Sequence, residues 1–245
     1  MAKGIEDAER RSEALREIAE EMAKVGMVEK AREVFEEAME VAKGIKDAWR
    51  RSEALERIAA EMAKVGEFER AMEVAKGIEA ASERSEALRE IAAEMAKAGE
   101  FERAIEVAKG IEDAWSRSRA LKRIAAEMAK VGMREKAEEA LKQAWQEAKQ
   151  AASFYELWEV AETAAKIGFT KEAVEFAHQI AGERTERLPR VLDALTEREE
   201  REGVKALLAL CGWAKGTAIH ACKCLIRLYP DHAVSIAEVV CTLSK

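Results

Sequence analysis

The residues of this chain that could support metal or covalent chemistry gather in its last 35 positions. Every cysteine lies there with two of the three histidines: Cys211, His220, Cys222, Cys224, His232 and Cys241. His220 and Cys224 are four residues apart, so on a helix they share a face and could seat a metal ion. Cys222 would point away from that face, and no CxxC motif supplies a second half-site. We therefore expect no metal site and favour buried free thiols that pack as small hydrophobic side chains.

A thiol nucleophile is the other chemistry that these residues suggest. It would need His220 or His232 as its base and a third group to orient that base. The candidates lie on apolar helical segments, with no glycine-rich loop and no donors for an oxyanion. His178 stands alone elsewhere in the chain. We expect no catalytic residue, no cofactor and no enzymatic activity.

The elements that position these residues belong to a chain built largely from one repeated segment. Its four near copies are RRSEALREIAEEMAKVG ending at Gly26, RRSEALERIAAEMAKVG at Gly66, ERSEALREIAAEMAKAG at Gly99 and SRSRALKRIAAEMAKVG at Gly132. A degenerate fifth copy, FYELWEVAETAAKIG, ends at Gly168. The glycines are 40, 33, 33 and 36 residues apart. A period of this length indicates stacked two-helix units, and therefore an all-α solenoid.

Each unit carries the pattern of two amphipathic helices. In the second unit an apolar stripe at spacings of three and four indicates a first helix that begins near Asp47, its N-cap, and ends at Gly66. That stripe comprises Leu55, Ile58, Ala59 and Met62. The second helix is expected from Glu67 to Lys76, closed by Gly77, with Phe68, Ala71, Met72 and Ala75 on one side.

The second helices are expected to differ in length. The first unit has VEKAREVFEEAMEVAKG where the second has FERAMEVAKG, an insertion of seven residues, and the fourth carries the comparable MREKAEEALKQAWQEAKQ. Seven residues add two turns and rotate the apolar face by only about 20°. The insertions therefore lengthen helices without breaking the stack, and one edge of the array should be uneven.

These units resemble the tetratricopeptide repeat family over residues 8 to 181. The third unit places large, small, aromatic and glycine residues on that family's spacing at Leu88, Ile91, Ala92, Met95, Gly99, Phe101 and Ala104. Alanine replaces the usual small glycine of the first helix, methionine replaces an aromatic, and the closing proline is missing. The resemblance implies antiparallel helix pairs in a right-handed superhelix, whose first helices line a concave, partner-binding groove. It implies no chemistry.

The resemblance and the repeat divide the chain in two. Residues 1–181 are expected to hold about five repeat units, and residues 182–245 a diverged helical cap with helices near 186–195, 200–210, 217–229 and 231–243. The opening MAKGIEDA nearly matches VAKGIEDA at residues 107–114, so the chain starts in mid-repeat. This leaves open an apolar flank that a second copy could cover, a segment of a larger multidomain sensor or assembly protein, and an engineered or recently duplicated array.

If the first helices line a groove, their polar positions are the candidate binding residues. By unit these are Glu53, Glu56 and Lys64, then Glu86, Arg89 and Lys97, then Arg119, Lys122 and Lys130, with Glu13, Arg16 and Lys24 before them. The charge changes from mixed to basic along this series, so we expect a protein or peptide partner, and an acidic segment would suit the basic end. The expected function is a non-catalytic protein–protein interaction scaffold.

Three series of side chains recur in register and have a simpler interpretation beside a functional one. The lysines Lys24, Lys64, Lys97, Lys130 and Lys166 could grip carboxylates, but each also stabilises the end of its own helix. The arginines Arg11, Arg51, Arg84 and Arg117 could bind phosphates, although ion pairs with neighbouring units are favoured. Trp49 and Trp115 could be contact hot spots, although packing against the preceding short helix is favoured.

Composition excludes several classes of protein. The net charge is −7 and gives no basic footprint for DNA or RNA, so nucleic acid is an unexpected partner. No apolar run is long enough for a membrane span, and no secretory signal opens the chain, so we expect a soluble cytoplasmic protein. Charged residues make up 36% of the chain and asparagine is absent, which suggests a thermophilic source.

Overall fold

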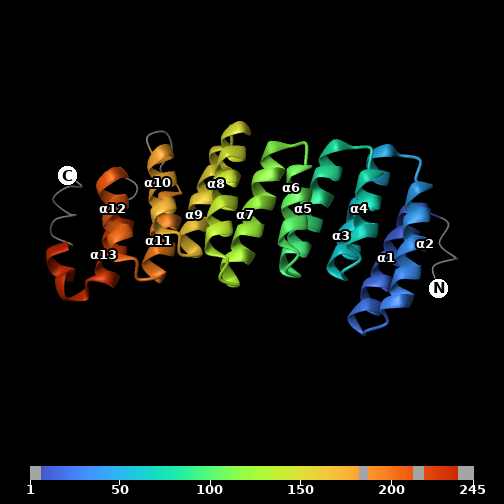
Figure 1. The fold of residues 1–245 in the computed structure, drawn as a ribbon, viewed down its shortest axis with the longest axis horizontal. Coiled ribbons are helices and arrows are strands. Elements are labelled where there is room, and N and C mark those ends of the chain that lie inside the picture. Colours follow the sequence, from blue (N-terminus) through green and yellow to red (C-terminus); the bar gives the residue numbers. More distant parts are fainter. Residues whose placement is uncertain (1–6, 182–186, 212–217, 237–245) are drawn as a thin grey trace. The chain divides into compact units, whose positions relative to one another are not determined.

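The structure is a computed structural model that describes residues 7–181, 187–211 and 218–236, and these ranges contain helices and no strand (Figure 1). The expected all-α fold is confirmed. The chain divides into two compact units, residues 1–128 and 129–245, so that the division falls inside one helix. No helix within the described ranges is long and apolar enough to cross a membrane.

The first unit is a series of antiparallel helix pairs. Its helices are α1 (Ala8–Lys24), α2 (Val28–Lys43), α3 (Ala48–Lys64), α4 (Phe68–Lys76), α5 (Ala81–Lys97), α6 (Phe101–Lys109) and most of α7 (Ala114–Lys130). Helix α1 packs on α2, α3 on α4, and α5 on α6, while the first helices α1, α3 and α5 also contact one another in sequence. The pairs are thus stacked in chain order, as the repeat predicted.

Local signals set the ends of these helices. The side chain of Asp47 accepts a hydrogen bond from the backbone N–H of Arg50 at 2.9 Å, which caps the start of α3 as expected. Gly66 follows α3 with a φ of +84°, in the left-handed region where a side chain is strained. Gly26, Gly99, Gly132 and Gly168 share this conformation. Equivalent turns therefore separate the two helices of each pair.

The predicted apolar stripe of α3 lies in the core of the second repeat. Leu55, Ile58, Ala59 and Met62 are all buried. In α4 the expected Phe68, Ala71 and Ala75 are buried as well. Met72 is only half-buried, and Val74 takes a buried place in its stead. The buried face of α4 therefore includes Val74 beside Phe68, Ala71 and Ala75.

The expected difference in helix length is confirmed. Helices α2 and α8 (Arg134–Gln150) have 16 and 17 residues, whereas α4 and α6 have 9 each. In the first unit the α1–α2 pair extends beyond the turn of α3 and α4 (Figure 1). That edge of the unit is uneven, as the seven-residue insertion predicted.

The second unit continues with helix pairs and the diverged segment. It contains α8, α9 (Phe154–Lys166), α10 (Thr170–Ala181), α11 (Leu188–Glu197), α12 (Arg201–Cys211), α13 (Ala218–Leu228) and a 3₁₀ turn (Pro230–His232). The degenerate fifth copy is α9, which packs on α10. Helix α11 contacts α9 and α13. Three of the four expected cap helices are found, and most of the fourth lies outside the described residues.

Candidate functional site: an acidic groove between two tryptophans

Within residues 1–128, the first helices of successive repeats line a hollow of about 720 Å³, here called the acidic groove. It lies over the N-terminal halves of α3, α5 and α7. Its lining residues are Trp49, Glu53, Glu56, Ala81, Ser82, Glu83, Ser85, Glu86, Glu112, Asp113, Trp115 and Ser116. Carboxylates dominate this set, and no lysine or arginine belongs to it. The volume lies in the range of sites that hold a small ligand or a few side chains of a peptide.

The sequence predicted part of this groove. Three residues of the expected set line the groove together: Glu53, Glu56 and Glu86. Lys64 and Lys97 are exposed at the far ends of their helices and do not line it. The remaining expected residues also lie outside the lining: Arg89, Arg119, Lys122 and Lys130. The structure therefore offers an acidic surface where the sequence suggested one that turns basic.

Two tryptophans flank the acidic groove. Trp49 begins α3 and leaves 60% of its surface exposed, so the favoured interpretation, packing against a neighbouring helix, was wrong for this residue. Trp115 begins α7, and the guanidinium of Arg119 lies 4.5 Å from the centre of its ring. The repeat between them, the third, has the small Ser82 at the equivalent position. The alternation Trp, Ser, Trp leaves open space between two aromatic side chains.

Most carboxylates of the groove already have partners. Glu53 pairs with Arg57 at 2.6 Å, and Glu86 pairs with Arg89. Glu112 pairs with Arg84 at 3.0 Å. Asp113 accepts a hydrogen bond from the backbone N–H of Ser116 at 2.7 Å and so caps α7.

Glu56 is the exception. Within the described part of the chain, no hydrogen bond or ion pair reaches its carboxyl group. Burial, with the negative charge of Glu86 nearby, raises the pKa of Glu56 to about 7. The other three near copies of the repeat carry Arg16, Arg89 and Lys122 at the equivalent position. A carboxylate thus replaces a cation at one point of the repeat, and it lies in the groove.

The neighbouring hollow between α1 and α3 is different in charge. Its volume is about 320 Å³, and arginines enter its lining: Arg10, Arg50 and Arg57. Arg50 on α3 pairs with Glu9 on α1 at 2.6 Å and so connects the first and second repeats. In the third unit Glu83 replaces Arg50 at the equivalent position, which makes the groove beyond it acidic.

The recurring lysines are held by their own helices. Lys24, Lys64 and Lys97 each pair with the glutamate three residues earlier, at 2.8, 2.7 and 2.7 Å respectively. Lys166 pairs with Glu162 at 2.6 Å. These local pairs support the simpler interpretation of the lysines as helix-end residues.

Two of the recurring arginines, Arg51 and Arg84, join successive repeats, as the favoured interpretation predicted, whereas Arg11 pairs with Glu37 on α2 of its own repeat at 3.0 Å. Arg51 donates to the backbone carbonyl of Ile45 at 2.8 Å and pairs with Glu79 in the next loop. Arg84 repeats the arrangement with the carbonyl of Ile78 at 2.8 Å and with Glu112. Their positive charge is thus used within the fold.

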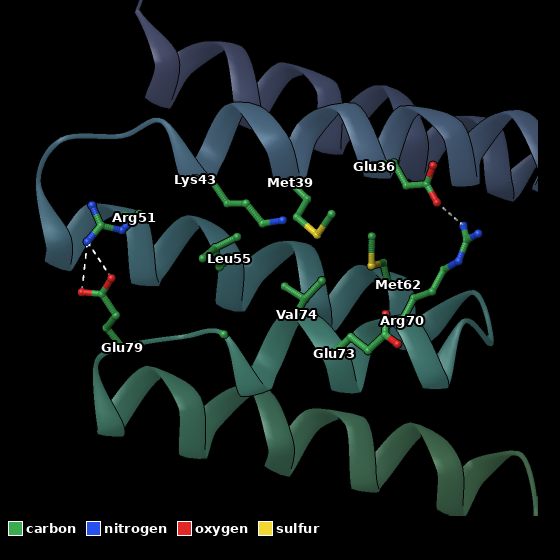
Figure 2. A pocket seen from close by; sticks show the side chains of 11 residues that line it. Glu36, Met39, Lys43, Arg51, Leu55, Met62, Arg70, Glu73, Val74 and Glu79 are labelled. Atoms are coloured by element: carbon green, nitrogen blue, oxygen red, sulfur yellow. Dashed lines mark hydrogen bonds and ion pairs between the residues drawn. The ribbon is translucent and has the colours of Figure 1, made fainter.

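A second kind of pocket opens on the side of the second helices (Figure 2). It has a volume of about 720 Å³ and lies between α2, α3 and α4. Met39, Leu55, Met62 and Val74 form its apolar floor. Two ion pairs frame it, Glu36 with Arg70 at 2.8 Å and Arg51 with Glu79 at 3.0 Å.

This pocket recurs one repeat further along. A hollow of about 480 Å³ is lined by Met72, Lys76, Leu88, Met95, Arg103 and Val107, each of which lies 33 residues after a lining residue of the first pocket. The recurrence marks the pocket as a property of every short second helix. We therefore take the acidic groove, which breaks the repeat, as the candidate functional site.

In the second unit the structure gives the histidine and cysteine pattern a third member. His220 and Cys224 lie on one face of α13, as expected, and both approach Asp193 on α11. The sequence offers no signal for Asp193, which precedes His220 by 27 residues. Cys224 is buried and free, Cys222 is half-buried and free, and the side chains of Cys211 and Cys241 lie outside the described residues.

Comparison with known proteins finds similar chains among solved structures. No family model and no curated protein matches the chain. Among solved structures it is similar to the crystal structure of Ton1535 from Thermococcus onnurineus NA1, with 19% identity, a TM-score of 0.31, and coverage of 98% of this chain and 80% of that one.

Two similar structures are repeat proteins. A circular tandem repeat protein with novel repeat topology and enhanced subunit contact surfaces has 19% identity and a TM-score of 0.24, over 97% of this chain and 54% of that one. The de novo designed helical repeat protein DHR64 has 23% identity and a TM-score of 0.19, over 97% and 98%. Similarity this weak adds nothing to the fold that the helices themselves show, and membership of the tetratricopeptide family stays a prediction from the sequence.

Proposed function

We propose that this protein is a non-catalytic scaffold that binds a positively charged peptide segment of another protein in the acidic groove. The observation that carries the proposal is the half-buried carboxyl of Glu56, which has no hydrogen bond or ion pair among the described residues and lines the same groove as Trp49 and Trp115. A lysine or arginine side chain placed there would pair with Glu56. The exposed ring of Trp49 would add a cation–π contact.

The pairing has a clear energetic reason. An ionised carboxylate that is partly removed from water is unfavourable until an opposite charge approaches it. A bound cation would therefore stabilise the charged form of Glu56 and gain attraction from Glu53 and Glu86 nearby. Aromatic side chains with exposed area, such as Trp49, supply much of the binding energy at peptide interfaces.

The acidic partner expected from the sequence fits the structure less well. Lys122 is only 9% exposed, so its charge is poorly placed for contact with a partner. Arg119 lies over the ring of Trp115. Arg89 is buried and pairs with Glu86 and Glu90. The basic partner is therefore favoured over the acidic one.

Fluorescence polarisation with labelled decapeptides tests the proposal. The probes are a lysine- and arginine-containing set and a matched set in which glutamate replaces each cation. We expect the basic set alone to bind, and Glu56→Gln or Trp49→Ala to weaken binding by about 10-fold, which corresponds to about 1.4 kcal/mol.

The control variant is Glu33→Gln, which removes the same charge from an exposed position of α2 outside the groove. It should leave the affinity unchanged. Equal weakening by Glu33→Gln and Glu56→Gln would show attraction to overall charge only and would contradict the groove as the site. Binding of the acidic set would favour the partner that the sequence suggested.

A second candidate, self-association, is favoured by one further observation. Helix α1 presents Ala14, Ile18, Met22 and Val25 around a hollow of about 560 Å³. The counterparts of Ile18 and Met22 in α3 are Ile58 and Met62, which are buried. A second copy could cover this face. Light scattering of the wild type and of Ile18→Glu tests the idea: a dimer that the variant disrupts supports it, and a wild-type monomer at high concentration contradicts it.

A further inference from the structure

Three side chains with metal-binding atoms converge between α11 and α13 in the second unit. The Nε2 atom of His220 lies 2.8 Å from Oδ1 of Asp193. The Sγ atom of Cys224 lies 3.8 Å from the same oxygen. All three ligand atoms lie within 4.8 Å of one another. The set therefore offers one oxygen, one nitrogen and one sulfur ligand around a single point.

These separations are close to what a tetrahedral ion requires. Zinc binds carboxylate oxygen and imidazole nitrogen at about 2.0–2.2 Å and thiolate sulfur at about 2.3 Å, which places neighbouring ligand atoms roughly 3.3–3.7 Å apart. The observed separations fall on both sides of that range. Rotations of the His220 and Asp193 side chains, which are partly exposed, can make up the difference.

We propose that Asp193, His220 and Cys224 form a binding site for a zinc-like divalent transition-metal ion. The thiolate and imidazole select such an ion over Mg²⁺ and Ca²⁺, which prefer sites made of oxygen atoms alone. The inference concerns the second unit and is independent of the acidic groove.

The position of the site suits an ion that enters from solvent. Cys224 is buried, whereas the side chains of His220 and Asp193 are 30% and 40% exposed. One side of the cluster is therefore open, and a water molecule can supply the fourth ligand of the tetrahedron. The four-residue spacing of His220 and Cys224 keeps both on one face of α13, and the packing of α13 on α11 brings Asp193 to them.

The same groups have a role without an ion. His220 and Asp193 are joined by a hydrogen bond, and burial raises the pKa of the Cys224 thiol, which favours its neutral form. A metal ion would displace that proton and convert the thiol into a thiolate ligand. The hydrogen-bonded packing arrangement and the metal site thus differ in one measurable property, the appearance of a metal–thiolate bond.

Titration of the metal-free protein with Co²⁺ tests the proposal, because a cobalt–thiolate bond gives a charge-transfer band in the near ultraviolet. We expect the band in the wild type and its loss in Cys224→Ser. His220→Gln should weaken Co²⁺ and Zn²⁺ binding by at least about 10-fold. The matched control is Cys222→Ser, which removes a neighbouring thiol on another face of α13 and should leave the band and the affinity unchanged.

The outcomes separate the proposal from other sources of metal binding. Zinc should raise the melting temperature of the wild type and of Cys222→Ser but not of His220→Gln, whose partly exposed side chain can be replaced without opening the core. Absence of the band in the wild type overturns the proposal. It is overturned equally if His220→Gln, verified as folded by circular dichroism, binds Co²⁺ as tightly as the wild type.

Discussion

Arg51, in the first turn of α3, pairs with Glu79 in the loop before α5, 28 residues further along the chain. One guanidinium nitrogen of Arg51 lies 3.0 Å from each carboxylate oxygen of Glu79. The other terminal nitrogen donates to the backbone carbonyl of Ile45 at 2.8 Å. From the first turn of α3, Arg51 thus bonds to a carbonyl in the loop before its helix and holds the loop before α5 in place. The repetition of this contact at Arg84 shows how a sequence repeat becomes a regular stack.

Substitution of Arg51 by alanine should therefore destabilise the protein. We expect a loss of about 1–2 kcal/mol in the free energy of unfolding, because a charge-assisted bond to a partly buried carbonyl is removed. Arg57→Ala is the control: Arg57 is half-exposed and pairs with Glu53, so its loss should cost less than about 0.5 kcal/mol. Guanidinium denaturation measures both, and equal midpoints for the two variants would contradict the role given to Arg51.

Two glycines that look alike in the sequence should respond oppositely to alanine. Gly66 has a φ of +84° with no atom within 4 Å of an added Cβ, so alanine there should cost about 1–2 kcal/mol through backbone strain alone. Gly77 has a φ of −83°, and its added Cβ would meet the carbonyl oxygen of Val74 at 3.4 Å. Gly77→Ala should be neutral or stabilising by up to about 1 kcal/mol. Thermal denaturation of both variants measures the two changes in stability. A larger loss of stability in Gly77→Ala than in Gly66→Ala would contradict the prediction.

Much of the fold could be predicted from the sequence because its signals are local. The cap at Asp47, the turn at Gly66 and the spacing of Leu55, Ile58 and Met62 depend only on residues within one helix or one turn. The lengths of α2 and α8 followed from counting residues between equivalent glycines. The conformation of Gly77 did not follow, because a glycine after a helix can adopt either hand.

The candidate sites could not be predicted in the same way, because they depend on packing between helices of different repeats. Glu56 looked like one polar position among many, and its raised pKa arises from the residues that surround it in the stack. Trp49 was expected to pack and is exposed instead. Asp193 gave no signal, because only the contact of α11 with α13 places it beside His220. Both proposed binding sites therefore lie where the structure departs from the repeat.

The core of the second unit should depend strongly on one aromatic pair. Trp145 on α8 stacks on Phe176 of α10, with ring centroids 4.3 Å apart and planes inclined by 7°. Trp145 is buried, so Trp145→Ala should cost about 3–5 kcal/mol. Trp49→Ala removes the same side chain from an exposed site and should cost less than about 0.5 kcal/mol. Urea denaturation followed by circular dichroism tests this, and similar losses for the two variants would contradict it.

Glu56 should make the stability of the protein depend on pH near neutrality. Its pKa in the folded protein is about 7, above the ordinary value of 4.5, so the folded state holds a proton that the unfolded state has lost. The stabilisation is complete below about pH 4.5 and is lost as the pH rises to 7. Glu53, Glu83 and Glu86 add to this effect by repulsion, and Arg57 opposes it. With allowance for solvent screening, the loss is on the order of 1–2 kcal/mol.

The variant Glu56→Gln should remove this pH dependence, because glutamine does not ionise. Its free energy of unfolding should exceed that of the wild type by a margin that grows between pH 5 and about 7. Glu13→Gln supplies the opposite sign: hydrogen bonding to Arg16 lowers the pKa of Glu13, so its contribution is present above the ordinary carboxyl pKa and lost as the pH falls. Denaturation from about pH 3 to about pH 8 covers both effects and tests both variants. A parallel course for the wild type and Glu56→Gln would mean that Glu56 is already ionised in the folded protein, and it would contradict the raised pKa that supports the proposed cation site.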